Sequence, residues 1–484
     1  MIQLKRKQQR HVVTGFFLLI CSGALAQENK SDTRFESYTD SAEIEVVLKG
    51  AAAGIVKLLG YYGDGNLERD SSIADSSGKV VFRNPKHFDE GMYYAVYSDN
   101  SFIAFLLGHN QKIFLHTDRM DIAKNMKTNS AENKLYCENQ IYESNFAARI
   151  DSAKNKMTAA AVGSKLYSAH KKEVDNLVSE KEEVVKGYVK KYPGSFFAKF
   201  KMLGQNPRLH EMKKPNGDID TMAQTIAHRN EYWNNYDFSD MRLLRTPVYF
   251  NKLKKYLTTL FYQRGDSMLS GVKFILDKVD KGDKEVFSFT VNYLLLTYHE
   301  PPVMGGEIIF CYTVDNYFTR EKAFWSDSVN IYRTQRQSDM MRPSMLGETG
   351  QDVNCKNEKG EYVNLYSIKK PIRVVYLFNP DCEHCQKETP KLKKLYDKWK
   401  SKGLEVYAII VAGEYDKWHK YINDLHLDWV NVIDPKYESG YHKKYYVSIT
   451  PGLYVLDAKN KIVAKQAMPD SLEEIFERMV GGKN

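Results

Sequence analysis

The most constraining stretch of this 484-residue chain is residues 371–390, PIRVVYLFNPDCEHCQKETP. It begins with a mostly apolar run at 372–378, typical of a buried strand, and a turn at 379–381 follows. Cys382 and Cys385 then stand where a helix is expected to begin. Two residues between the cysteines place both thiols on the first helical turn, close enough to form a disulfide. The stretch therefore predicts an α/β domain with redox chemistry.

Cys382 is the candidate nucleophile because we expect it at the helix N-terminus. Unpaired backbone N–H groups and the helix dipole favour a thiolate there, and the thiolate is the species that attacks a disulfide. Two alternatives are a zinc half-site and a structural disulfide. Zinc usually needs a second cysteine pair or a histidine pair at short spacing, whereas His419, His426 and His442 are scattered. We expect no metal and no cofactor.

The first 26 residues have the pattern of a signal peptide, with a basic start and an apolar run at 12–20. That run is too short to cross a membrane. A lipid anchor would require cleavage before Cys21, but Ile20 is not the small residue that such a site needs. We expect cleavage after Ala26, no membrane span in the mature chain, and a location in the periplasm or cell envelope of a Gram-negative bacterium.

The charge and the cysteine count narrow the function further. The formal net charge is +9, but four of the positive charges fall in the leader, at Lys5, Arg6, Lys7 and Arg10. The net charge of the rest of the chain is therefore too small to indicate nucleic-acid binding. Cysteines of an exported protein usually pair. Five would remain after cleavage, an odd number, and we interpret three as lone core residues: Cys137, Cys311 and Cys355.

Changes in hydrophobic periodicity divide the chain. After a polar linker at 27–41, turn-separated short strands predict a small β-sandwich at 42–128. Amphipathic segments predict an α-helical domain at 129–337. A polar, Pro-containing hinge is expected at 338–346, before the redox domain at 347–484. Expected strands are 44–48, 55–62, 77–82 (a turn that leads into a strand), 91–97 and 112–116, and expected helices are 132–156, 164–192, 196–203, 219–235, 247–264 and 285–298.

The helical domain carries a charged segment at 236–247, YDFSDMRLLRTP. It resembles a recurrent signature of helical domains in multidomain envelope proteins. The residues themselves favour a salt-bridged helix junction formed by Asp237, Asp240, Arg242 and Arg245. We find no catalytic constellation in residues 42–337, and therefore expect residues 347–484 to carry the chemistry on their own.

Beyond the cysteine pair, strands and helices alternate to the end of the chain, which predicts parallel strands closed by a hairpin. Together with the sequence Ile449-Thr450-Pro451 before that hairpin, residues 345–484 resemble a TlpA/ResA-type thiol–disulfide oxidoreductase of the thioredoxin superfamily. The resemblance implies a thioredoxin-like α/β fold. It also implies that Pro451 is a cis-proline facing the disulfide and that Thr450 docks an extended client chain.

The same resemblance assigns roles around the cysteines. Cys382 and Cys385 fit the redox pair, and Pro390 fits a proline within the active-site helix. Glu388 fits the Cys-x-x-Cys-x-x-Glu pattern, and its spacing returns it to the helix face of Cys385. A partly buried carboxylate there would exchange the proton of Cys385. The alternative is a first-turn acid that the helix dipole favours.

One departure concerns the residues around the first cysteine. The family usually has Trp before it, whereas this chain has Asp381, whose charge would raise the pKa of Cys382. Glu383 acts in the same direction, and His384 in the opposite one as a donor to the thiolate. Dithiol oxidants of the DsbA kind carry His at this place. We expect His384 to dominate and to shift the redox equilibrium about tenfold, but oxidation, reduction and isomerisation all stay open.

The sequence thus predicts an exported, multidomain thiol–disulfide oxidoreductase with a β-sandwich-like N-terminal domain, an α-helical middle domain and a thioredoxin-like C-terminal domain. Its expected partners are client proteins with thiols or disulfides, and a redox partner that supplies or accepts electrons. A peroxiredoxin is the alternative enzyme, but residues 379–381 lack the Thr that such a site needs. A binding or scaffold protein with an accessory thioredoxin unit is the alternative outside enzymes.

Overall fold

A computed structural model describes residues 39–234 and 236–481. The chain divides into two compact units, 1–253 and 254–484, and the boundary falls within α5 (Pro247–Thr259).

The predicted signal peptide, the alternative anchor at Cys21 and most of the predicted linker at 27–41 lie outside the described residues. Within the part of the chain that is described, no helix is long and apolar enough to cross a membrane.

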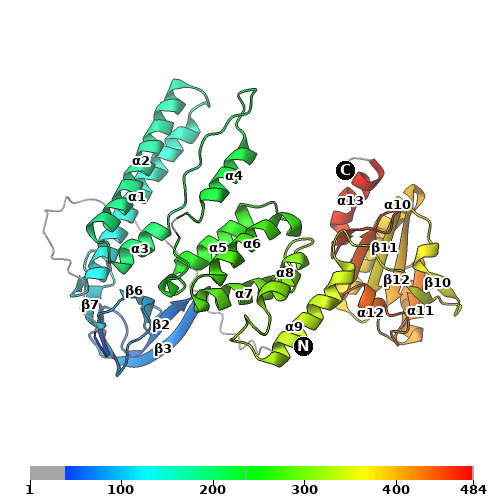
Figure 1. Cartoon of the computed structure of the whole chain (residues 1–484), viewed down its shortest axis with the longest axis horizontal. Helices are drawn as coiled ribbons and strands as arrows, with labels where there is room; N and C mark the ends of the chain where they lie inside the picture. The colour runs from blue at the N-terminus through cyan, green and yellow to red at the C-terminus, as the bar shows by residue number, and fades with distance from the viewer. Residues whose placement is uncertain (1–38, 235, 482–484) are drawn as a thin grey trace. The chain divides into compact units, whose positions relative to one another are not determined.

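The first unit begins with a β-sandwich of two four-stranded sheets (Figure 1). One sheet has the strand order β4-β1-β7-β8, and the other β3-β2-β5-β6. Alternate side chains of β1, such as Ile44 and Val46, are fully buried in a core shared by both sheets. The strands are β1 (Ala42–Lys49), β2 (Gly54–Tyr62), β3 (Gly65–Ala74), β4 (Lys79–Asn84), β5 (Gly91–Val96), β6 (Phe102–Leu107), β7 (Lys112–Asp118) and β8 (Lys127–Thr128). The predicted sandwich is confirmed.

Three strands of the sandwich were not among the predicted ones: β3, β6 and the two-residue β8. β3 is an edge strand with charged residues such as Glu68 and Asp70, and it has mostly exposed or half-buried side chains, so its sequence lacks apolar alternation. β6 is a short apolar run, and most of its residues are buried. Such a run cannot be assigned from periodicity alone.

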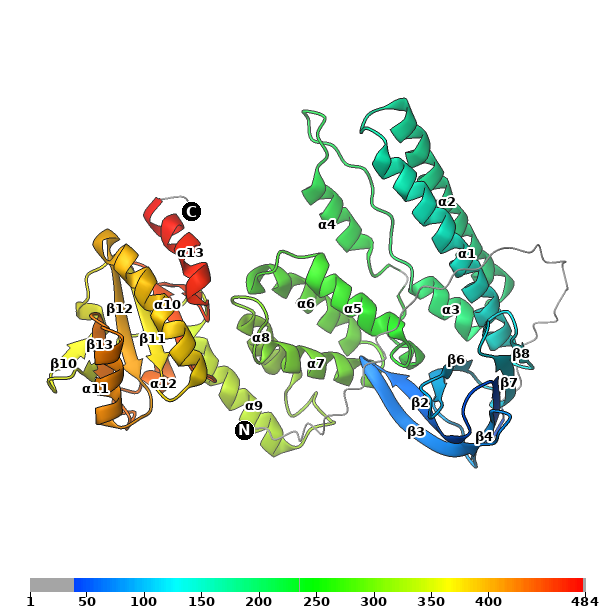
Figure 2. The same ribbon diagram turned by 180° about the vertical axis from the view of Figure 1, so that it is seen from behind.

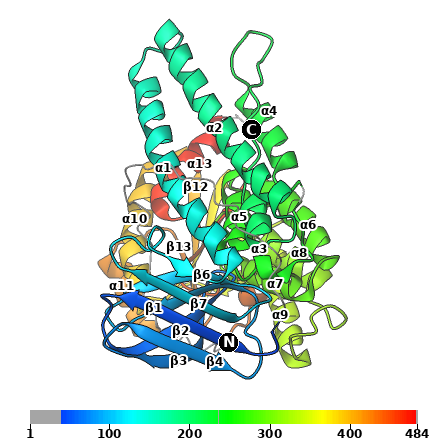
Figure 3. The same cartoon turned by 90° about the vertical axis from the view of Figure 1, so that its left-hand side faces the viewer.

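Helices complete the first unit. The two long helices α1 (Ala131–Ala159) and α2 (Lys165–Lys191) form an antiparallel hairpin (Figure 3). Ser130 and Ser164 cap them, each accepting a hydrogen bond from a backbone N–H three residues on. The shorter elements are α3 (Phe196–Leu203), α4 (Thr221–Glu231) and η1 (Met241–Leu243). The predicted helices agree with the observed ones, except that α4 ends at Glu231 rather than at 235, and α5 ends at Thr259 rather than at 264.

The second unit contains helices that the sequence analysis missed. They are α6 (Gly265–Asp280), α8 (Glu307–Tyr317) and α9 (Ser328–Met341), and α7 (Lys284–Tyr298) lies where a helix was predicted. The segment predicted as a hinge, 338–346, is partly buried, and its assignment as a hinge stays a prediction. It holds the end of α9 and the 3₁₀ turn η2 (Arg342–Ser344), and Ser344 is fully buried. The hydroxyl groups of Ser338 and Ser344 have hydrogen-bond partners inside the protein.

The C-terminal part of the second unit is a seven-stranded mixed sheet, in the order β10-β9-β13-β12-β11-β14-β15. The strands are β9 (Asn354–Lys356), β10 (Tyr362–Asn364), β11 (Ile372–Phe378), β12 (Leu404–Ile410), β13 (Val430–Ile433), β14 (Gly452–Leu456) and β15 (Ile462–Lys465). β11, β12 and β13 are parallel, and β14 and β15 form the predicted antiparallel hairpin.

Helices lie on the faces of this sheet, as in a thioredoxin fold. The helices α10 (Glu383–Trp399), α11 (Tyr415–Asp424) and α13 (Pro469–Gly481) pack on one face, and Figure 2 shows α10 lying across the strands. The short α12 (Tyr441–Lys444) and η3 (Leu365–Ser367) contribute to the core on the opposite face. The predicted fold class is confirmed, and β11 ends in the middle of the sheet at the redox motif.

Candidate redox site

The cysteine pair stands at the junction of β11 and α10. All seven residues of β11 are buried, and the strand lies between β12 and β14. At its end, the carbonyl O of Asn379 accepts a hydrogen bond from the backbone N–H of Cys382 at 3.0 Å. Cys382 is the N-cap residue of α10, and Cys385 lies on its first turn. The local sequence therefore places both thiols at the amino end of a helix, as predicted.

Cys382 is held in a polar, half-buried environment. Its Sγ lies 3.3 Å from the carbonyl O of Thr450. The pKa of Cys382 is lowered, mainly by hydrogen bonding with the side chain of Thr450, and also by the backbone N–H groups of Cys385 and His384. Partial burial opposes these effects. The Thr450 hydroxyl and these backbone N–H groups are neutral dipoles. They favour a thiolate at a sulfur that solvent can reach.

Cys385 has the opposite properties. Its side chain is fully buried, and burial raises the pKa of its thiol to about 11. The backbone N–H of Asn379 donates to Sγ at 3.5 Å and offsets this burial only in part. At neutral pH the pair thus comprises one accessible, activated sulfur and one shielded, protonated sulfur.

The remaining described cysteines are free and buried, as predicted. Burial raises the pKa of Cys137 to about 12, and it also raises the pKa values of Cys311 and Cys355. Low thiolate content and poor access make these three thiols unreactive.

The Thr450–Pro451 peptide bond is cis, as the family resemblance implies. Thr450 precedes β14 and contacts Cys382 across 68 positions of sequence. The neighbouring Ile449 is 60% exposed, so an apolar side chain lies in solvent beside Thr450. The assignment of Thr450 and Pro451 to client docking stays a prediction.

Glu388 is partly buried, as predicted, with 14% of its side chain exposed. One carboxylate oxygen pairs with Lys391 at 3.0 Å, and the other is buried without a hydrogen-bond partner among the described residues. An oxygen without a donor is able to accept a proton, so the arrangement is compatible with the predicted exchange with Cys385.

The charged neighbours of Cys382 differ from the expectation. The ring of His384 is exposed, and its backbone N–H, rather than its ring, acts on Cys382. Among the described residues no hydrogen bond joins the imidazole to Cys382, and the tuning role of His384 stays a prediction. Asp381 is exposed and pairs with Lys417 of α11 at 3.3 Å, and Glu383 is also exposed. The sequence analysis missed Lys417, which lies 36 positions away.

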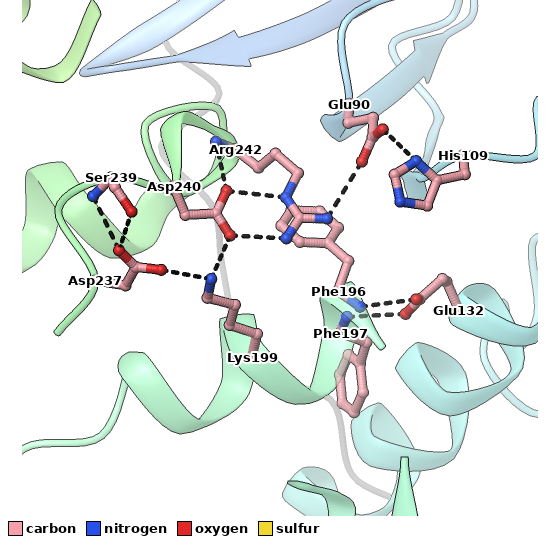
Figure 4. Close-up of polar contacts among 10 residues, drawn as sticks. All are labelled: Glu90, His109, Glu132, Phe196, Phe197, Lys199, Asp237, Ser239, Asp240 and Arg242. Carbon is pink, nitrogen blue, oxygen red and sulfur yellow. Dashed lines mark hydrogen bonds and ion pairs between the residues drawn. The ribbon is translucent and has the colours of Figure 1, made fainter. Parts of the chain in front are cut away.

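The predicted charged junction is confirmed in the first unit (Figure 4). Arg242 donates two hydrogen bonds to Asp240, at 2.9 and 2.7 Å, and pairs with Glu90 at 3.3 Å. Lys199 of α3 bridges Asp237 and Asp240 at 2.7 and 2.8 Å. Each of these charges has at least one partner of opposite sign, which supports a structural role.

Two further carboxylate contacts extend this region. Arg245 is buried and lies 3.7 Å from Asp89, so the fourth predicted residue also contacts an acid. The carboxylate of Glu132 accepts from the backbone N–H groups of Phe196 and Phe197, both at 2.8 Å, at the start of α3 (Figure 4). Glu132 was not predicted, because its partners lie more than sixty positions away.

Within residues 39–234 and 236–481, no group of three or more His, Cys, Asp or Glu side chains is arranged to hold a metal ion.

Comparison with family models identifies two regions. Residues 346–465 match the AhpC/TSA family, and residues 226–343 match a domain of unknown function, DUF5106. No curated protein matches the chain.

Several solved structures resemble the C-terminal region. A domain of a possible thiol-disulfide isomerase from Cytophaga hutchinsonii is 30% identical and covers 29% of this chain and 99% of its own, with a TM-score of 0.27. The thioredoxin domain of a thiol-disulfide oxidoreductase from Bacteroides vulgatus is 27% identical and covers 28% and 97%, with a TM-score of 0.27. A thiol:disulfide interchange protein from a Bacteroides species is 27% identical and covers 29% and 94%, also with a TM-score of 0.27.

Proposed function

Because the C-terminal region of this chain belongs to the AhpC/TSA family of thioredoxin-like proteins, we propose that the protein exchanges disulfides with client proteins through Cys382 and Cys385. One observation carries this proposal: the two thiols of the pair have opposite pKa shifts and opposite access to solvent. Thiol–disulfide exchange needs this division, since one sulfur attacks the client and the other resolves the complex.

The reductive direction begins at the Cys382 thiolate. It attacks one sulfur of a client disulfide, a new bond forms between Cys382 and that sulfur, and the client S–S bond breaks. The second client sulfur leaves as a thiolate and takes up a proton. In the resulting mixed disulfide, Cys382 carries no charge, and Thr450 lies beside it to contact the client chain.

Resolution uses Cys385. Its proton moves to the carboxylate of Glu388, and the new thiolate attacks Sγ of Cys382. The bond between Cys382 and the client breaks, and Cys382 and Cys385 become a disulfide. The first client sulfur leaves as a thiolate and takes the proton that Glu388 holds. Two electrons pass from the protein to the client, so a redox partner must reduce the pair again. The same steps in reverse oxidise a client dithiol. The reduction potential of the cysteine pair, relative to that of its partners, decides the direction.

The proposed place of action is the periplasm or envelope of a Gram-negative bacterium. The leader at 1–26 would direct export of the protein to this compartment. Proteins in such compartments form disulfides, so clients are available there. The upstream sandwich and helices would hold or select them.

An insulin-reduction assay together with client trapping tests the proposal. Wild-type protein with dithiothreitol is expected to precipitate insulin chains faster than dithiothreitol alone. Cys385→Ala is expected to retain clients from an envelope extract as mixed disulfides at Cys382. Cys382→Ala provides the matched control and should retain none. Equal retention by the two variants, with no insulin reduction by wild type, would reject the proposal.

A further inference from the structure

The loop that carries Thr450 is anchored by residues outside the thioredoxin-like domain. Within the second unit, the backbone N–H of Tyr446 donates to the hydroxyl of Ser344 in η2 at 3.0 Å. The side-chain amide of Gln337 in α9 donates to the hydroxyl of Tyr446 at 2.9 Å. Tyr446 lies four positions before Thr450. The main chain and the side chain of one loop residue are therefore both fixed by the segment 337–344.

The anchoring segment is itself firmly held. Ser344 is fully buried, and its hydroxyl also lies 3.3 Å from the hydroxyl of Tyr454 in β14. The carbonyl O of Ser344 accepts from Lys465 of β15 at 2.9 Å. Lys465 pairs with Glu307 of α8 at 3.1 Å, and their side chains are only 3% and 4% exposed. Burial makes such contacts costly to break, so η2 provides a fixed support for the loop.

The loop in turn sets the environment of the attacking sulfur. Thr450 is the loop residue beside that sulfur: its carbonyl O lies 3.3 Å from Sγ of Cys382, and hydrogen bonding with its side chain is the largest cause of the lowered pKa of Cys382. A hydrogen bond weakens steeply when its geometry changes. A small displacement of Thr450 would therefore remove the main support of the Cys382 thiolate, without touching either cysteine.

We propose that Ser344 and Gln337 are positioning residues of the redox site, which hold the Tyr446–Thr450 loop against Cys382. This inference rests on the proposed function and deepens it. It makes the end of α9 and η2 a part of the redox unit, in contrast to the expectation that residues 347–484 carry the chemistry on their own. The helical segment thus takes part in setting the reactivity of the attacking thiol.

Two full-length variants test this role. Ser344→Ala removes the acceptor of the Tyr446 N–H, and Tyr446→Phe removes only the hydroxyl that Gln337 contacts. The readout is the rate of iodoacetamide modification of Cys382 in the reduced protein as a function of pH. A displaced Thr450 should raise the apparent pKa of Cys382, and modification at neutral pH should slow by roughly threefold to tenfold, since only the thiolate reacts.

Asp327→Ala is the matched control. Asp327 caps the opposite end of α9, where its carboxylate accepts from the backbone N–H of Asn330 at 2.8 Å. Its removal should lower thermal stability and leave the pH profile of Cys382 unchanged. If Ser344→Ala does not fold, Tyr446→Phe decides the matter, because it deletes one hydroxyl of a half-buried side chain.

The proposal is overturned if folded Ser344→Ala and Tyr446→Phe keep the wild-type profile, or if Asp327→Ala shifts the profile as much as they do. Alkylation does not require a client. A shifted profile in a protein that fails to reduce insulin would therefore uphold the positioning role and reject the proposed function.

Discussion

The redox site and the charged junction of the first unit both gather groups with shifted pKa values, but they use them differently. At the junction, burial opposes ionisation of Asp240, yet Arg242 and Lys199 outweigh burial and hold its pKa at about 2. At the redox site, the pKa of Cys382 is lowered by a hydroxyl and by backbone N–H groups, which provide no counter-charge. A matched charge is stable and inert, whereas an accessible thiolate supported by dipoles remains free to react.

The largest expected effect separates the two regions by activity. Cys382→Ser should reduce insulin reduction to the rate without protein, a loss of about a thousandfold or more, because the serine hydroxyl stays protonated at neutral pH. Arg242→Ala should leave the rate per folded molecule unchanged. A comparable loss of rate in folded Arg242→Ala would show that the junction takes part in the chemistry.

Arg242→Ala should lose stability although it keeps its activity. Arg242→Ala leaves Asp240, whose side chain is only 7% exposed, without its two-hydrogen-bond partner. We expect a loss of about 2–4 kcal/mol in the free energy of unfolding, measured with urea. Arg242→Lys keeps the charge but loses the paired hydrogen bonds, and should lie between wild type and alanine. A loss below about 0.5 kcal/mol would mean that water replaces the pair.

The contribution of Asp240 to the free energy of unfolding should also depend on pH. The pKa of Asp240 is lower in the folded state than the ordinary value of about 3.9. Its ionised form therefore stabilises the fold above that value, and this contribution is lost as pH falls toward about 2. The stability difference between wild type and Asp240→Asn should be constant at neutral pH and shrink below about pH 4. A difference that stays constant down to pH 2 would assign the effect to packing.

The smallest effects are expected from the exposed residues around Cys382. His384→Ala keeps the backbone N–H that acts on the sulfur, so its redox potential against glutathione should move by less than about 30 mV. Lys417→Ala should raise the apparent pKa of Cys382 slightly, because it leaves the negative charge of Asp381 without its partner. A larger shift in His384→Ala would mean that the imidazole reaches the sulfur in solution.

Local spacing explains what the sequence could predict. The strand before Cys382, the helix after it and the position of both thiols follow from contiguous residues. The cis bond at Pro451 followed from resemblance to a family. Lys417 and Glu132 carry no local signal, because their partners are brought near only by the fold.

The segment predicted as a hinge, 338–346, has contacts that a local signal does not reveal. The segment around Ser344 contains Pro343 and polar residues, which usually indicate an exposed connection. The hydroxyl of Ser344 is buried instead, because two tyrosines, Tyr446 and Tyr454, supply polar partners for it in the interior. Such pairing depends on contacts about one hundred positions apart, which the local sequence does not reveal.

The most direct test of this account is the pH profile of iodoacetamide modification at every cysteine of the reduced, folded protein, read by peptide mass mapping. Cys382 should react first, with an apparent pKa below the ordinary thiol value of about 8.5. Cys385 should react only as pH approaches about 11, and Cys137, Cys311 and Cys355 only on unfolding. Faster modification of Cys385 or Cys311 than of Cys382, or titration of Cys382 at or above the ordinary value, would contradict the assignment of Cys382 as the attacking thiol.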